Sequence, residues 1–141
     1  MKQEVMLHIK GIQTYEGQEP DVIELTTEGT LERAEDGWLM AYEESDLTGL
    51  GGTTTTFRVK GNVVDLRRTG ALQSQMVFQE GVGHDSLYQT DVGALMVRVC
   101  AKKVLHDISE DGGILQVSYT IELENTMAGM VDYFITIAPK G

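Results

Sequence analysis

Arg68 is the residue whose type and surroundings most suggest binding chemistry. Val64 and Leu66 stand at alternate positions before it, so in a strand its guanidinium points to the apolar side. Glu44 shares a face with Tyr42 in the same way. A guanidinium that loses its water needs a partner that accepts two hydrogen bonds. Two interpretations stay open. In the first, Arg68 has a structural role, either paired with Glu44 or reaching solvent at the rim of the barrel. In the second, Arg68 binds the carboxylate or phosphate of a bound molecule.

Three tyrosines are compatible with either interpretation, because each offers a hydroxyl group to a mostly apolar interior. Small-molecule sites typically combine an apolar pocket with a few polar groups that point to its centre. An arginine among those groups favours an anionic ligand with an apolar body, such as an acyl chain or an aromatic acid. The predicted ligand-binding residues are Arg68, Glu44, Tyr42, Tyr88 and Tyr119.

Motifs for nucleotide binding are incomplete in this sequence. Residues 49–53 are glycine-rich, but no Gly-Lys-Ser/Thr ending follows, and threonines stand where a phosphate-binding helix would begin. Thr54 also occupies the position of the third glycine of a dinucleotide fingerprint. We therefore interpret this segment as an ordinary loop and predict no cofactor.

The histidines and the cysteine do not suggest a reactive site. The three histidines are far apart in the chain and match no metal-ligand spacing: His8, His84 and His106. His84 and His106 are each followed by an aspartate, in segments that we interpret as loops. Cys100 is out of phase with Val97 and Val99 and has no evident charged partner to activate it. We predict no catalytic residue and no metal site, and we favour a protein that is not an enzyme.

The elements that must position these residues are strands. Valine, isoleucine and threonine, whose branched side chains suit a pleated strand, make up 35 of the 141 residues. Ten short segments are rich in strand-forming residues, and in most of them apolar side chains recur at alternate positions, with glycine in many of the turns between them. The segments are residues 5–10, 23–31, 38–42, 53–59, 63–66, 72–78, 87–90, 95–102, 115–124 and 130–138. Residues 130–138 are apolar on both faces, so their orientation stays open.

Short connections between these segments favour antiparallel pairing of neighbours, because parallel strands need longer crossovers. Each strand has one apolar face, so the sheet must curve to bury it. We predict an all-β fold: a single up-and-down antiparallel β-barrel of about 8–10 strands, with a two-sheet sandwich as the alternative. Helix is expected to be limited to one or two turns, within residues 43–52.

Length and charge limit the class of protein further. A chain of 141 residues fits one domain, so residues 1–141 are predicted to form a single barrel domain. With 11 basic against 22 acidic residues, the net charge of −11 argues against nucleic acid as a partner. The absence of a leader and of a long apolar run predicts a cytoplasmic protein that does not bind membranes. The oligomeric state stays open.

Several short motifs follow one another in an order that resembles a known family. They are Leu7-His8-Ile9-Lys10, Tyr42-Glu43-Glu44-Ser45-Asp46-Leu47, Arg68-Thr69-Gly70-Ala71, Tyr88 with Gly93, and Tyr119. The chain resembles, over nearly its whole length, the YwiB-like family of small bacterial proteins, which is classed as a domain of unknown function. The resemblance implies a lipocalin-like, or calycin, β-barrel and a Gram-positive source. It implies no catalytic or ligand residues, because the family has none assigned.

Two functional hypotheses follow from these observations. The first is a non-catalytic barrel that binds a small amphipathic or anionic ligand at its mouth or centre. The second is a protein-interaction or regulatory module whose barrel is filled by its own side chains. An enzyme ranks third, because no nucleophile–base pair or pair of acids emerges from the spacing.

Overall fold

The computed structural model describes residues 2–15, 17–44, 51–71, 73–90, 93–123 and 126–140. Ten strands are formed: β1 (Lys2–Thr14), β2 (Asp21–Ala34), β3 (Gly37–Glu43), β4 (Thr53–Lys60), β5 (Val63–Gly70), β6 (Gln73–Gln79), β7 (Gly83–Thr90), β8 (Gly93–Ser109), β9 (Gly112–Leu123) and β10 (Thr126–Pro139). Most of residues 43–52, where a helical turn was predicted, lie outside the described residues.

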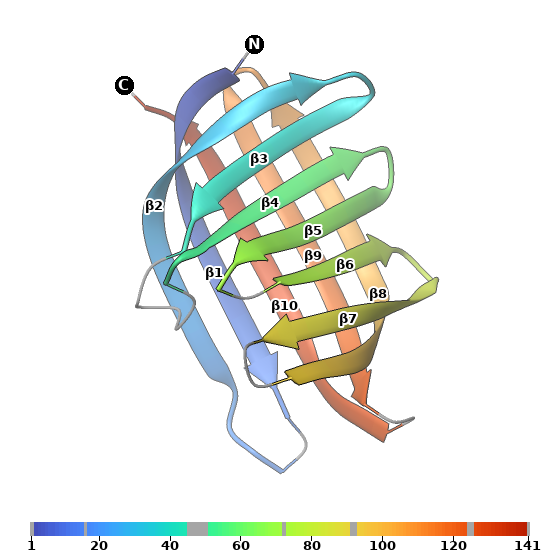
Figure 1. The fold of residues 1–141 in the computed structure, drawn as a ribbon. Coiled ribbons are helices and arrows are strands. Elements are labelled where there is room, and N and C mark those ends of the chain that lie inside the picture. The colour runs from blue at the N-terminus through green and yellow to red at the C-terminus, as the bar shows by residue number, and fades with distance from the viewer. Residues whose placement is uncertain are drawn as a thin grey trace.

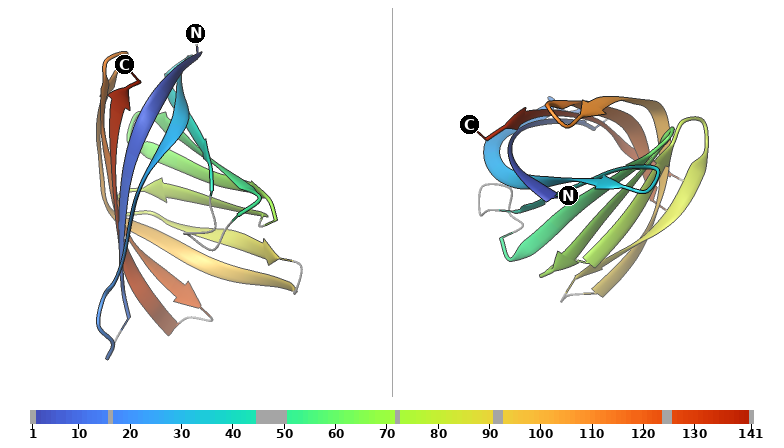
Figure 2. Two further views of the ribbon diagram at one scale, coloured as in Figure 1. Left: turned by 90° about the vertical axis from the view of Figure 1, so that its left-hand side faces the viewer. Right: turned by 90° about the horizontal axis from the view of Figure 1, so that it is seen from above.

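The strands form a closed antiparallel barrel in which each strand pairs with its neighbours in the chain, and β1 pairs with β10 to close it. The prediction of an all-β, up-and-down barrel is therefore confirmed. The short strands β3–β7 cross one side of the molecule, and the long strands β8–β10 and β1 run steeply behind them (Figure 1). Two further views show how the long strands curve around the interior (Figure 2).

Hydrophobic side chains at alternate positions of β1–β6 and β8–β10 fill the interior of the barrel. The inward positions of β1, for example, are Val5, Leu7 and Ile9, which are almost fully buried. The aromatic rings of Tyr42 of β3, Phe57 of β4 and Phe78 of β6 are also buried in the interior. Burying apolar area on this scale supplies the main stabilisation of the fold.

A β-bulge in β8 changes which residues face the interior. The pairing of β8 with β9 shifts between Ala101 and Lys103. Val99 and Ala101 are buried before the shift, whereas Val104 and Ile108 pack against the core after it. The extra residue reverses the inward parity, which lets one 17-residue strand keep an apolar face over its whole length.

One local prediction was wrong. The segments around His84 and His106 are not loops but parts of β7 and β8. The turn between β8 and β9 is formed by residues 110–111, and Gly113 is already in β9. Gly113 has a φ of +148°, and a Cβ there would lie 1.9 Å from the Asp107 carbonyl oxygen, so this close approach of β8 and β9 requires glycine.

Candidate functional site

Four polar side chains form a continuous row on the inner wall of the barrel. Tyr42 of β3 pairs with Thr55 of β4, Thr55 pairs with Arg68 of β5, and Arg68 pairs with Ser74 of β6. All four residues are buried, and residues paired across antiparallel strands share a face. We call Tyr42, Thr55, Arg68 and Ser74 the polar row.

The polar row lies directly beside an apolar one. Two residues along each strand, the paired inner residues are Met40, Phe57, Leu66 and Met76, and these are almost fully buried. The inner wall thus changes from apolar to polar over two residues along each strand. The polar side lies toward the end of the barrel where β3 and β5 finish and β4 and β6 begin.

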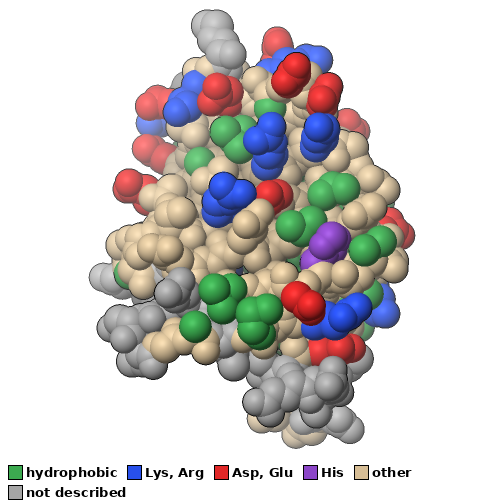
Figure 3. All heavy atoms as spheres, turned by 45° about the vertical axis from the view of Figure 1, so that its right-hand side comes forward, with side chains coloured by type: hydrophobic (Ala, Val, Ile, Leu, Met, Phe, Trp, Pro, Cys, Tyr) green, Lys and Arg blue, Asp and Glu red, His purple; other side chains and the backbone are tan. Residues whose placement is uncertain are grey.

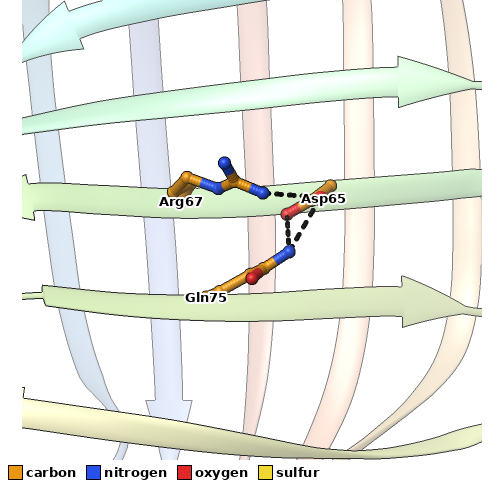
Figure 4. A network of polar contacts seen from close by, with 3 residues as sticks. All are labelled: Asp65, Arg67 and Gln75. Carbon is orange, nitrogen blue, oxygen red and sulfur yellow. Dashed lines mark hydrogen bonds and ion pairs between the residues drawn. The ribbon is translucent and has the colours of Figure 1, made fainter.

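Arg68 and its neighbour Arg67 show how alternation determines this arrangement. Arg67 lies on the outer face, where its guanidinium is 3.7 Å from Asp65, and Asp65 also accepts hydrogen bonds from Gln75 (Figure 4). Arg68 points the other way and is only 8% exposed. It is therefore buried inside the barrel rather than solvated at the rim.

Glu44 extends the polar surface by one step toward the end of the barrel. Its backbone N–H donates to the Thr53 carbonyl at 2.8 Å, which continues the β3–β4 ladder beyond Glu43. Glu44 is 8% exposed, and Thr53 beside it is also buried. Together, Glu44 and Arg68 are the buried charged side chains within the described ranges.

Several buried atoms in this group lack a hydrogen-bond partner. They are Oε1 of Glu44, Oγ1 of Thr55 and Oγ of Ser74. A buried polar atom without a partner costs about 1–3 kcal/mol. Native proteins rarely tolerate such atoms unless water or a ligand satisfies them. Three of them gathered at one end of one barrel therefore mark this end as the candidate site.

The Tyr42 hydroxyl lies among these groups. Burial raises the pKa of the Tyr42 phenol far above its ordinary value, the nearby Tyr133 and the Glu44 carboxylate raise it further, and the Arg68 charge lowers it in part. Tyr42 is therefore a neutral hydroxyl at physiological pH, situated within the fields of one positive and one negative side chain.

Tyr133 of β10 completes the group from the other side of the barrel. Its hydroxyl lies 3.5 Å from that of Tyr42, and its ring centroid is 5.9 Å from that of Phe57. Sequence reasoning missed Tyr133 because β10 looked apolar on both faces. The signal was present, since Val131, Ile135 and Ile137, which are buried, alternate in phase with Tyr133.

The two remaining predicted site residues are placed differently. Tyr119 of β9 is buried, and its ring packs on Phe78 at a centroid distance of 4.4 Å. Phe78 is four residues along β6 from Ser74, so this contact belongs to the apolar core rather than to the polar row. The backbone of Tyr88 in β7 pairs with Ser74, but the side chain of Tyr88 lies outside the described part of the structure.

A hollow of about 270 Å³ borders Tyr42 where β2 separates from β3. The pairing of these two strands ends at Gly29 and Tyr42, and the carboxylates of Glu28 and Glu43 line the opening. Lys140 reaches Glu28 at 3.0 Å across the surface. The hollow is open and acidic, and this chain's own lysine already neutralises part of it.

Within the described residues, His84 and Asp85 of β7 point to opposite faces of the sheet. His84 points inward, with its Nε2 buried and without a partner, whereas Asp85 points outward to Arg98 at 3.8 Å. Successive residues of a strand face opposite ways, so His84 and Asp85 cannot act together. In the described ranges, no three His, Cys, Asp or Glu side chains are grouped as a metal site requires.

The outer surface is mixed in character. Acidic, basic and hydrophobic side chains are interspersed on the face drawn in Figure 3. Exposed hydrophobic residues scattered among charged ones are common on protein surfaces. The described residues include no helix that could cross a membrane.

Comparisons with known proteins agree with the fold. The family described as "Domain of unknown function (DUF1934)" matches residues 7–135. An "uncharacterized beta-barrel protein YwiB" of Bacillus subtilis is 27% identical over 139 residues, covering 96% of this chain and 95% of that protein. The crystal structure of ywiB protein from Bacillus subtilis matches with a TM-score of 0.88 at 23% identity, over 99% of this chain and 94% of that one.

Proposed function

The chain belongs to the DUF1934 family, and we propose that its barrel binds one small amphipathic or anionic molecule at the polar row, without chemistry of its own. The observation that carries this proposal is the group of buried polar atoms without partners on Glu44, Thr55 and Ser74. A ligand head group that bonds these atoms removes a cost that the free protein bears.

The surroundings of the polar row fit a ligand with an apolar body. The rings of Phe57 and Tyr133 and the side chain of Met40 lie next to it. The positive charge of Arg68 favours an anionic group on the ligand, because a guanidinium binds carboxylates and phosphates through two parallel hydrogen bonds. In this proposal the protein functions as lipocalin-like barrels do, with one ligand held in the interior.

A thermal-shift screen of acidic amphiphiles, namely fatty acids and aromatic carboxylates, tests the proposal. A ligand at 100 times its dissociation constant stabilises the folded state by about 2.7 kcal/mol, which raises the melting temperature by several degrees in a domain of this size. Arg68→Ala should lose the shift. Arg67→Ala is the matched control, because it removes the same side chain from the outer face of the same strand.

Ser74→Ala provides a milder test if Arg68→Ala does not fold, since it removes only one hydroxyl group. The proposal fails if no small amphipathic compound, anionic or zwitterionic, shifts the melting temperature of the wild-type protein. It also fails if Arg68→Ala and Ser74→Ala respond as strongly as Arg67→Ala.

A second candidate function is protein interaction, with the barrel filled by its own side chains. Leu87 and Met96 pair across β7 and β8 on the outer face and are 46% and 56% exposed. Neighbouring exposed hydrophobic residues of this kind are found at interaction sites. Replacing both with serine would abolish such an interaction but leave the thermal shift by small ligands unchanged.

A further inference from the structure

We infer that the molecule bound at the polar row is zwitterionic: an amino-acid-like compound with an apolar side chain, whose ammonium group bonds Glu44 and whose anionic group faces Arg68. This inference rests on the proposed function and specifies the class of ligand.

Glu44 supplies the first step of the argument. An ionised carboxylate can only accept hydrogen bonds, and its Oε1 is buried without a donor. A ligand that is only an anion would leave this oxygen unsatisfied and would add a like charge beside it. In a poorly solvated space that repulsion is strong. A head group with an N–H donor satisfies the same oxygen.

The balance of charge supplies the second step. Glu44 and Arg68 are the buried charged side chains in the described ranges, so the described part of the site contains one negative and one positive group. Glu44 lies beside Thr53, and Arg68 pairs with Thr55, two residues further along the same strand. Tyr42 also pairs with Thr55, so both charges lie near its side chain and both affect the pKa of its hydroxyl. Complementary potentials favour binding, so the matching ligand has one charge of each sign and no net charge.

The hydroxyl groups supply the third step. Thr55 and Ser74 flank Arg68 in the pairing register, and their oxygens lack partners. A hydroxyl group can donate to a carboxylate or accept from an ammonium group. These two residues can therefore bond either end of a zwitterion, while the rings of Phe57 and Tyr133 offer contact to its apolar side chain.

Three probes with the same phenyl group separate the possible head groups. They are phenylalanine, which is a zwitterion, 3-phenylpropanoate, which is an anion, and phenethylamine, which is a cation. Isothermal titration calorimetry with the wild-type protein should show phenylalanine binding at least about tenfold more tightly than either of the others, since each charge-assisted hydrogen bond is worth about tenfold or more.

Glu44→Gln should abolish the preference of the protein for phenylalanine over 3-phenylpropanoate. Glu43→Gln is the matched control, because Glu43 is the preceding residue and lies on the outer face, at the hollow. It should retain the preference. If Glu44→Gln does not fold, the ranking of the three probes on the wild-type protein decides the question by itself.

The possible results distinguish this inference from the proposed function. Tightest binding of 3-phenylpropanoate or of phenethylamine overturns the inference. An unchanged preference in Glu44→Gln overturns it as well. If acidic amphiphiles shift the melting temperature but phenylalanine does not bind, the inference fails and the proposed function stands. If neither the acidic amphiphiles nor the three probes bind, both fail.

Discussion

Replacing Thr55 with valine should stabilise the ligand-free protein. The Thr55 side chain is 0% exposed and its hydroxyl oxygen has no partner. Valine has nearly the same shape and keeps the strand preference. The change removes an unsatisfied buried hydroxyl group, which costs about 1–3 kcal/mol, and a buried methyl group replaces it. We expect a gain of about 1–3 kcal/mol in the free energy of unfolding, and a rise of about 3 °C in melting temperature for each kcal/mol.

Urea denaturation measures this gain, and an unchanged m-value would show that the effect lies in stability rather than in the compactness of either state. Thr56→Val is the control, because Thr56 lies on the opposite face of the same strand and reports the change in strand preference alone. It should stay within about 0.5 kcal/mol of wild type. A loss of stability in Thr55→Val would refute the reasoning, since the hydroxyl group would then have a partner in solution.

Two further predictions concern the core and the response to pH. Leu7 is fully buried, whereas Leu105 is 42% exposed. Leu7→Ala should therefore lower the free energy of unfolding, measured by urea denaturation, by about 2–5 kcal/mol, and Leu105→Ala should lower it much less. Equal losses in the two variants would contradict the assignment of Leu7 to the core. Because the folded pKa of Tyr42 is raised above its unfolded value near 10, the protein should lose up to about 1.4 kcal/mol of stability per pH unit above pH 10. Tyr42→Phe should reduce that slope between pH 9 and pH 11, and an unchanged slope would count against the burial of this phenol.

The sequence contains enough information to orient single residues but not to assemble the site. Alternation after Val64 and Leu66 predicts that Arg68 points inward, and the structure buries it. The contact between Tyr42 and Tyr133 joins residues 91 positions apart. It depends on how the long strands curve across the short ones, and no local pattern encodes that curvature.

Two features of the strands account for the other differences. The alternation of β8 breaks at Lys102 because a bulge inserts one residue there, so the inward positions of Val104 and Ile108 could not be extrapolated from Val97. Thr55 lies within four consecutive threonines, whose uniform polarity conceals which of them are buried. In both cases the alternation of apolar and polar residues does not show which side chains point into the barrel.

The pairing of β1 with β10 affects the order in which the protein can be made. Every other pairing in the described chain joins consecutive strands, so these hairpins can form in turn as the chain leaves the ribosome. Val5 meets Pro139 and Thr14 meets Met130 only after β2 to β9 have been synthesised between them. Until then the first strand presents an open edge and a bare apolar face, the features most prone to aggregation. Pairing with β10 therefore removes this open edge and encloses the apolar interior in a single step.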